Sequence, residues 1–207
     1  MNEIKFVYFD VGGVTIKDFS DSDTEWNAVK KIWGIPSERS DELDKKFDDF
    51  EEFACVGSVE INDFLPILEK EFGVKVPKNF SINEEFANRF YKNEGIWKII
   101  NECKNKGKIG LLTNMYLGML ETIRKKELVP EIEWNTIVDS SLVKFKKPQK
   151  EIYEIAQLKS GVKAEEILFV DNMERNLVIP RSIGWKTFLY NSGDYERSNK
   201  ELEQFLG

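Results

Sequence analysis

Short apolar runs recur along the chain, separated by longer stretches in which apolar residues return every three to four positions. Five runs have the length and character of buried strands: 4–9, 108–113, 136–139, 167–170 and 185–190. Most are apolar at successive positions, which is typical of parallel strands that helices cover on both faces. The pattern therefore predicts a sheet whose two faces are both buried.

Helical periodicity fills the intervals between these runs. Ile96, Ile99, Ile100 and Cys103 fall at i, i+3, i+4 and i+7, and Gly107 follows as a plausible helix end. Similar patterns lie around 117–124, 152–156 and 176–183, the last containing a proline that should bend or shorten the helix. Strands that alternate with helices predict an α/β fold with a parallel sheet and right-handed crossovers.

The interval after the first strand is too long for a single helix. Residues 17–90 carry several amphipathic stripes of their own, one with Trp26 and Trp33 on a shared face, and a capping box that begins at Ser81. We therefore expect a helical domain at 17–90, inserted into a core formed by residues 1–16 and 91–207. The aromatic stripes are expected to form its core, and the acidic run 41–52 to be a solvated helix face.

Composition narrows the possible chemistry. The 207 residues include no histidine, which excludes a Ser-His-Asp triad, a Cys-His pair and an imidazole base. Thirty Lys and Arg residues against 37 Asp and Glu give a formal net charge of −7, which disfavours nucleic-acid and anionic-membrane partners. Two distant cysteines and a strand that begins at once, without a signal peptide, predict a cytoplasmic protein.

Candidate chemistry lies where the predicted strands end, because ligands of open parallel sheets bind at the carboxyl ends of the strands. The first strand ends in Asp10 and the fourth in Asp171, each followed by a turn. If these strands are neighbours, two carboxylates and a backbone carbonyl form a set of oxygen ligands, which suits a hard cation such as Mg²⁺. The plainer interpretation is two separate turn aspartates.

Two further strand ends carry groups that can bind phosphate. Thr113 and Asn114 end the second strand, where a hydroxyl and backbone N–H groups can hold a phosphate oxygen. Lys147, before a proline, follows the third strand and can balance phosphate charge. Taken separately, the first is better explained as a plain helix cap and the second as a solvated basic loop. Their order along the chain is more informative than any one of them.

An acid, a hydroxyl, a lysine and a second acid thus end successive strands, with a helical insert after the first. In this respect the chain resembles the haloacid dehalogenase-like hydrolase superfamily, through the stretches FDVGGV, LLTN, KKPQKEIYE and ILFVDNMERN. More narrowly, it is similar to the subgroup whose helical cap follows the first motif, which contains many small sugar-phosphate phosphatases. The resemblance implies a doubly wound, Rossmann-like sheet of order 5-4-1-2-3 with a small helical cap.

The resemblance also implies a role for each matching residue. Asp10 would be the nucleophile that accepts the phosphoryl group, and Asn172 would take the place of a second acid that orients metal-bound water. The Mg²⁺ ligands would be Asp10, Asp171 and the carbonyl oxygen of Gly12. The phosphate oxygens would be held by Thr113, Asn114 and Lys147.

Position 12 departs from the family pattern. Phosphatases of the superfamily usually carry there an Asp that protonates the leaving oxygen, and this chain has Gly12. Either the leaving group needs little protonation, or a cap residue such as Asp18 or a water acts instead, or the protein is slow or inactive. If the missing acid limits the second step, Gly12→Asp should speed phosphate release.

These features predict a Mg²⁺-dependent hydrolase, a phosphatase that acts on a small phosphorylated metabolite as a monomer or weak homodimer. The alternatives are a non-catalytic relative that binds a phosphorylated ligand or partner, and a metal-free 2-haloacid dehalogenase. The dehalogenase ranks lower because that subgroup usually has an aromatic residue at position 12. Phosphonate cleavage would need a Schiff-base lysine in the cap, for which Lys17 and Lys30 are candidates by location.

Overall fold

The computed structural model describes residues 3–20 and 23–207. Within them, the centre is a sheet of five strands in the order β5-β4-β1-β6-β7, and all neighbouring strands are parallel. The strands are β1 (Phe6–Phe9), β4 (Lys108–Thr113), β5 (Thr136–Asp139), β6 (Ile167–Asp171) and β7 (Lys186–Leu189). Counted along the chain and read from the β7 edge, this order is 5-4-1-2-3. The predicted α/β fold is confirmed.

The register aligns the strand ends at which candidate chemistry was expected. Phe9 of β1 lies opposite Leu111 of β4 and Val170 of β6. The N–H of Asp10 continues this ladder by donating to the carbonyl of Val170 at 2.9 Å. The carboxyl ends of β4, β1 and β6 therefore meet at one edge of the sheet, where parallel sheets bind ligands.

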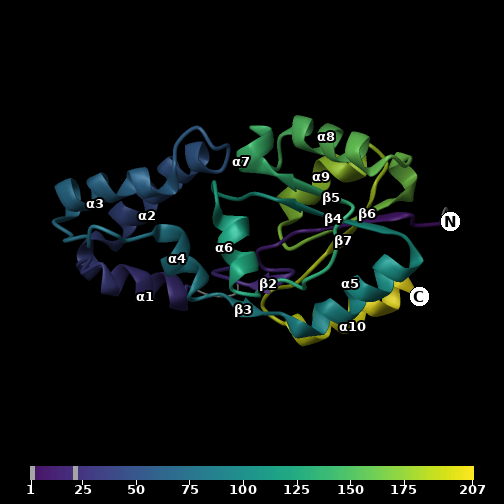
Figure 1. Ribbon diagram of the computed structural model, residues 1–207, viewed down its shortest axis with the longest axis horizontal. Helices are drawn as coiled ribbons and strands as arrows, with labels where there is room; N and C mark the ends of the chain where they lie inside the picture. The colour runs from purple at the N-terminus through teal and green to yellow at the C-terminus, as the bar shows by residue number, and fades with distance from the viewer. Residues whose placement is uncertain (1–2, 21–22) are drawn as a thin grey trace.

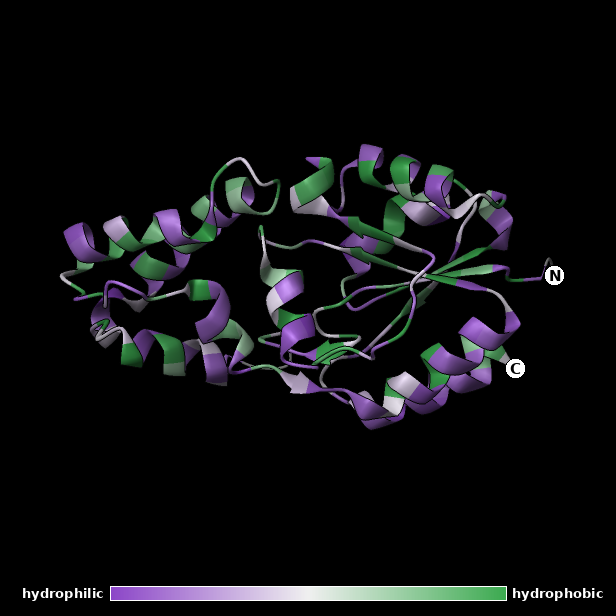
Figure 2. Ribbon diagram, viewed as in Figure 1, coloured by the Kyte–Doolittle hydropathy of each residue, from purple (hydrophilic) through white to green (hydrophobic). Residues whose placement is uncertain are grey.

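Helices cover both faces of the sheet (Figure 1). One layer contains α5 (Glu94–Lys106) and α10 (Tyr195–Leu206), and the other contains α8 (Lys150–Ser160) and α9 (Glu174–Ser182). Figure 2 shows that the central strands are largely hydrophobic, whereas these helices are hydrophobic on one side only. This distribution buries the sheet on both faces and leaves the polar helix faces in solvent.

Alternate residues of β1 enter different apolar clusters, because successive side chains of a strand point to opposite faces. Val7 and Phe9 pack in the cluster that contains Ile96 and Ile100 of α5. Phe6 and Tyr8 instead pack in the cluster of Ile152, Tyr153 and Phe169. The expectation of an apolar run that is buried on both sides is therefore confirmed for this strand.

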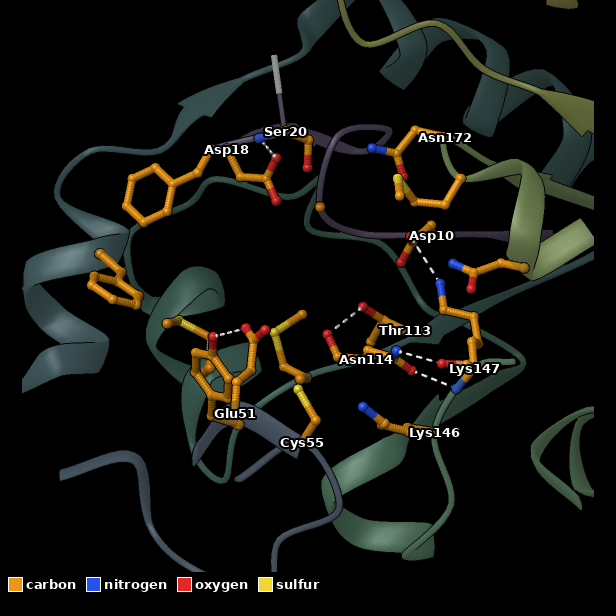
Figure 3. Close-up of a pocket in the computed structure, with 18 of the residues that line it drawn as sticks. Asp10, Asp18, Ser20, Glu51, Cys55, Thr113, Asn114, Lys146, Lys147 and Asn172 are labelled. Atoms are coloured by element: carbon orange, nitrogen blue, oxygen red, sulfur yellow. Dashed lines mark hydrogen bonds and ion pairs between the residues drawn. The ribbon is translucent and has the colours of Figure 1, made fainter. Parts of the chain in front are cut away.

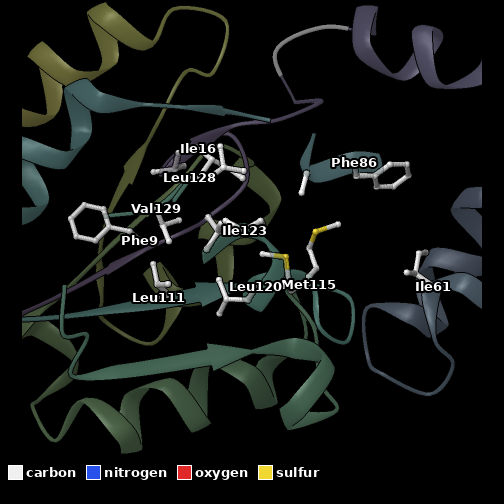
Figure 4. Packing of buried hydrophobic residues seen from close by; sticks show 14 of the residues in the cluster. Phe9, Ile16, Ile61, Phe86, Leu111, Met115, Leu120, Ile123, Leu128 and Val129 are labelled. Atoms are coloured by element: carbon white, nitrogen blue, oxygen red, sulfur yellow. The ribbon is translucent and has the colours of Figure 1, made fainter. Parts of the chain in front are cut away.

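The first apolar cluster continues beyond the sheet into the segment that follows β1. Figure 4 shows it running from Phe9 and Leu111, past Ile123 of α6 (Met119–Lys125), to Phe86 and Ile61. The segment holds α1 (Thr24–Ile32), α2 (Ser40–Ala54), α3 (Leu65–Phe72) and α4 (Ile82–Ala87), which lie together at one end of the molecule (Figure 1).

Aromatic rings fill the interior of this helical segment. Trp26, Phe47 and Phe86 contact one another with ring centroids 5.0–6.0 Å apart, and Phe64 packs on Phe47 at 5.2 Å. The prediction that the aromatic stripes form a core is confirmed for Trp33, Phe64 and Phe86, which are buried. We retain as a proposal that residues 17–90 form a cap domain on a core of residues 1–16 and 91–207.

A small antiparallel pair joins the two ends of the proposed cap. Ile16 of β2 (Ile16–Lys17) pairs with Lys92 of β3 (Tyr91–Lys92), and Lys17 pairs with Tyr91. Such two-residue strands carry no periodic signal, so the sequence analysis did not predict them. Their pairing places the segment that leaves the sheet after β1 beside the segment that leads back to it before α5.

Other differences from the predicted elements are small. The first strand begins at Phe6 rather than Ile4, and α9 begins at Glu174 and contains Pro180 in its last turn before ending at Ser182. Cys55 and Cys103 are buried free thiols. Among the described residues, no helix combines the length and apolarity that crossing a bilayer requires.

Candidate active site

Asp10 lies immediately after β1, with 7% of its surface exposed. Its Oδ1 accepts a hydrogen bond from the N–H of Val11 at 2.7 Å, and its Oδ2 lies 2.8 Å from Lys147 Nζ. The hydroxyl of Thr15 donates to the Asp10 carbonyl at 2.6 Å. These contacts hold both the backbone and the carboxylate of Asp10 at the end of the strand.

Asp171 ends the neighbouring strand β6 and is fully buried. Its Oδ2 lies 2.6 Å from Lys147 Nζ, and its Oδ1 accepts a hydrogen bond from the N–H of Met173 at 2.8 Å. The side-chain amide of Asn176 donates toward both carboxylate oxygens, at 3.1 and 3.2 Å. Because a buried carboxylate without such partners is unfavourable, these donors stabilise Asp171 in one orientation.

Lys147 therefore lies between two carboxylates from adjacent strands. The residue is 3% exposed, and its ammonium rests 5.3 Å from the centre of the Phe169 ring. Burial alone lowers the pKa of Lys147, but the charges of Asp10 and Asp171 outweigh it and raise the pKa above the usual value. Burial in turn raises the pKa of Asp10 to about 7, against the opposing charge of Lys147.

Asn114, predicted to bind phosphate, clamps the backbone of Lys147. Its Oδ1 accepts a hydrogen bond from the Lys147 N–H at 2.7 Å, and its Nδ2 donates to the Lys147 carbonyl at 3.0 Å. These reciprocal bonds join the end of β4 to the loop that carries the lysine. The Asn114 side chain therefore positions Lys147, while its contact with phosphate stays a prediction.

A cavity of about 700 Å³ opens over these residues, between the sheet edge and the helical segment (Figure 3). Six of the seven residues singled out from the sequence line it: Asp10, Gly12, Thr113, Asn114, Lys147 and Asn172. The seventh, Asp171, lies behind Lys147 and contacts it directly. The structure thus brings the predicted residues together, and their individual roles stay predictions.

The glycine turn after Asp10 depends on Gly13 as well as Gly12. Gly13 adopts a φ of +70°, which side chains other than glycine rarely tolerate. A Cβ at this position would also lie 2.2 Å from the side-chain nitrogen of Asn172. Gly13 therefore allows Asn172 to reach the edge of the cavity.

The pair of carboxylates suits a hard divalent cation. Among the described residues no group of three or more Asp, Glu, Cys or His side chains could hold a metal. The predicted site instead combines two carboxylates with a backbone carbonyl, a donor set of the kind that Mg²⁺ binds together with water. In addition, the buried Oδ1 of Asn176 has no hydrogen-bond partner within residues 3–20 and 23–207, so it is available to accept from such a water.

Comparisons with known proteins identify the family of this chain. A family model for haloacid dehalogenase-like hydrolases matches residues 4–175. The chain belongs to this family.

Two curated relatives of this haloacid dehalogenase-like hydrolase are much longer proteins. Bifunctional epoxide hydrolase 2 of Sus scrofa is 22% identical over 220 residues, which cover 99% of this chain and 39% of the relative. The Rattus norvegicus protein of the same name is 24% identical over 168 residues, which cover 73% of this chain and 29% of the relative. The chain therefore spans less than half the length of either relative.

Solved structures share the fold of this hydrolase. A HAD family enzyme from Bacteroides thetaiotaomicron gives a TM-score of 0.77 at 19% identity, covering 93% of this chain and 96% of that one. The same enzyme in complex with magnesium and inorganic phosphate gives a TM-score of 0.71 at 19% identity, covering 92% of this chain and 96% of that one. An L-2-haloacid dehalogenase gives a TM-score of 0.66 at 17% identity, covering 91% of this chain and 84% of that one.

Sequence reasoning missed several residues of this hydrolase's cavity. Asn176 was interpreted only as the start of a helix, although it lies inside the matching stretch ILFVDNMERN. Glu51 corrects the expectation that the whole acidic run is solvated, because it lines the cavity and is hydrogen-bonded by the hydroxyl of Tyr116. Helical periodicity places Glu51 on α2, but the partner from outside the cap appears only in the folded chain.

Removal of the Tyr116 hydroxyl tests this contact. Burial raises the pKa of Glu51, and the hydrogen bond from Tyr116 opposes that rise by stabilising the ionised carboxylate. We expect Tyr116→Phe to lower the free energy of unfolding by about 1 kcal/mol where Glu51 is ionised. The loss should shrink as the pH falls through the folded-state pKa and Glu51 becomes neutral.

Denaturant unfolding at about pH 8 and about pH 4 measures this difference. Tyr91→Phe is the matched control, because Tyr91 is 57% exposed. An equal loss at both pH values would contradict a contact with ionised Glu51.

Proposed function

We propose that the protein is a Mg²⁺-dependent phosphatase for a small phosphorylated metabolite, acting through an aspartyl-phosphate on Asp10. The observation that carries this proposal is the placement of Lys147 Nζ within 2.8 Å of Asp10 and 2.6 Å of Asp171 beside an open cavity. A carboxylate can attack a phosphate dianion only where positive charge offsets their repulsion. We further propose that the protein works in the cytoplasm as a monomer or weak homodimer, without nucleic-acid or membrane partners.

In the first step, Asp10 attacks phosphorus and the bond from phosphorus to the leaving oxygen breaks. In the second step, water attacks the same phosphorus, and the bond to Asp10 breaks to release inorganic phosphate. Lys147 and Thr113 would hold the phosphoryl oxygens in both steps. A Mg²⁺ ion held by Asp10, Asp171 and the Gly12 carbonyl would neutralise phosphate charge.

The magnesium and phosphate bound by the Bacteroides thetaiotaomicron enzyme support the proposal by analogy of fold. The similarity to an L-2-haloacid dehalogenase keeps metal-free dehalogenation as a second candidate, since that reaction also uses an aspartate nucleophile. Phosphonate cleavage has less support, because the cap residue Lys30 is paired with Asp44 at 2.9 Å.

Hydrolysis assays separate these functions. We expect turnover of an aryl phosphate and of members of a sugar-phosphate panel with Mg²⁺, and its loss in EDTA. Halide release from a 2-haloacid, unaffected by EDTA, would instead favour the dehalogenase. A rise in melting temperature with beryllofluoride, without turnover of any substrate, would favour a non-catalytic phosphate-binding protein.

Replacement of Asn176 tests the proposed metal site without altering its ligands. Asn176→Leu removes two hydrogen bonds to Asp171 at similar side-chain volume. We expect Mg²⁺ affinity to fall about 10- to 100-fold, as is typical when a partner of a metal ligand is lost. Calorimetric Mg²⁺ titration measures this effect, and Asn199→Leu, remote from the cavity lining, serves as the control. Unchanged affinity in Asn176→Leu would contradict the site.

A further inference from the structure

The turn after β1 brings the chain back past the nucleophile. The carbonyl of Val11 accepts hydrogen bonds from the N–H groups of Thr15 and Ile16, at 2.9 and 3.0 Å. Ile16, the first residue of β2, also forms a parallel bridge with Gly12. Asp18, the first residue after β2, is therefore returned to the rim of the cavity that holds Asp10.

The Asp18 carboxylate occupies the space that a side chain at position 12 would fill. Its Oδ1 accepts a hydrogen bond from the N–H of Ser20 at 2.9 Å, which fixes the carboxylate. Its Oδ2 faces Gly12, where an added Cβ would lie only 2.2 Å away. Figure 3 shows Asp18 and Asp10 at the edge of the same cavity, which both residues line. The absence of a side chain at Gly12 is what admits this carboxylate.

Other carboxylates of the cavity have different surroundings. Glu51 is hydrogen-bonded by Tyr116, and Glu52 forms an ion pair with Lys146. Both lie on α2, as does Asp48, which also lines the cavity, whereas Asp18 borders the backbone two residues from the nucleophile. Position therefore favours Asp18 as the group that reaches the leaving oxygen.

We infer that Asp18 is the general acid and base of the reaction, an assignment that rests on the proposed phosphatase function. When Asp10 attacks phosphorus, the Asp18 carboxyl gives its proton to the departing oxygen, which leaves as an alcohol. When water attacks the aspartyl-phosphate, the Asp18 carboxylate takes one water proton, and hydrogen phosphate leaves as the Asp10 carboxylate re-forms. The two steps together consume one water and return both carboxyl groups to their starting states.

Leaving-group dependence distinguishes this role from a structural one. Asp18→Asn preserves side-chain size and an oxygen for the Ser20 N–H, but it cannot transfer a proton. We expect kcat/KM for glycerol phosphate, with its poor leaving group, to fall about 10²- to 10⁴-fold. The burst of dinitrophenolate from dinitrophenyl phosphate, a leaving group that needs no acid, should change less than about tenfold. Phosphorylated Asp10 should then accumulate, because its hydrolysis lacks a base.

Rapid-quench mass spectrometry and burst kinetics measure both effects. Asp48→Asn is the matched control, because it removes one charge from the same cavity and should show no leaving-group dependence. Equal slowing of both substrates by Asp18→Asn, without accumulated phosphoenzyme, would overturn the inference. Wild-type protein that hydrolyses neither substrate would instead reject the proposed function, and this inference with it, before any variant is compared.

Moving the carboxyl group between the two positions provides an independent test. Gly12 lacks the positive φ of Gly13, so its backbone conformation accepts a side chain once Asp18 is shortened. Gly12→Asp alone would press two carboxylates together. The expected gain in phosphate release should therefore require Asp18→Ala as well. We expect kcat/KM for glycerol phosphate to be at least about tenfold higher in the double variant Gly12→Asp with Asp18→Ala than in Asp18→Ala alone. No recovery in a double variant with wild-type melting temperature would contradict the inference.

Discussion

Replacing Asp10 with Asn is expected to abolish turnover of every phosphate ester that the wild-type protein hydrolyses. The amide has nearly the same shape as the carboxylate, but its oxygen is a poor nucleophile and cannot form a stable acyl phosphate. Loss of a nucleophile in other enzymes costs on the order of 10⁶-fold in kcat, and we expect a loss of about 10⁴-fold or more. Structure should be preserved, because the Asn oxygen can still accept from Val11 or Lys147.

Steady-state assays and mass spectrometry of quenched reactions check this prediction together. Wild-type protein should carry one phosphoryl group on the peptide that contains Asp10, and Asp10→Asn should carry none. Asp49→Asn makes the same charge change at an exposed position of α2 and should retain full activity. Comparable turnover by wild type and Asp10→Asn would remove the nucleophile assignment.

Lys147→Met should reduce both activity and stability. The ammonium is the buried counter-charge of Asp10 and Asp171, so its loss leaves two carboxylates close together without compensation. Breaking a buried ion pair on one side typically costs about 3–5 kcal/mol of unfolding free energy. Loss of a charge that stabilises the transferring group should also lower kcat on the order of 10³-fold.

A compensating change separates the two effects of Lys147→Met. Adding Asp171→Asn removes one of the unpaired carboxylates, so the double variant should regain stability while activity stays low. Denaturant unfolding without added metal measures the first effect, and hydrolysis of an aryl phosphate the second. If Lys147→Met unfolds at the wild-type denaturant concentration, the ammonium is not the balancing charge that its contacts indicate.

The strands of the sheet could be anticipated because burial and periodicity are local properties of the sequence, whereas their order was implied only by the family resemblance. Each of the runs around Phe9, Leu111 and Val170 is apolar at successive positions, as a strand covered on both faces must be. The four motifs then identify which residues end the strands. Since parallel strands present their carboxyl ends at one edge, Asp10 was expected to meet Asp171 if the two strands were neighbours, and the pairing of β1 with β6 meets that condition.

Contacts made by loops and by the insert could not be anticipated in the same way. The short strands β2 and β3 pair residues 16–17 with 91–92, far apart in sequence, and two residues are too few to show a period. Glu51 lies four residues after Phe47, on the buried side of α2. Its hydrogen bond to Tyr116 could not be read from that spacing, because it forms only where α2 meets the loop after β4. Asn176 likewise reads as an ordinary helix residue until β6 and α9 are placed.

The sequence by itself determined the fold class, the strand ends and the set of residue types gathered there, because these depend on burial and chain direction. Only the tertiary structure decided that Lys147 Nζ lies between the two carboxylates and that Asp18 stands against Gly12. Such placements depend on the backbone angles of turns and on side-chain rotamers, which neighbours distant in sequence select. A glycine that looked like a lost acid in the sequence is, in the folded chain, the space that another carboxylate occupies.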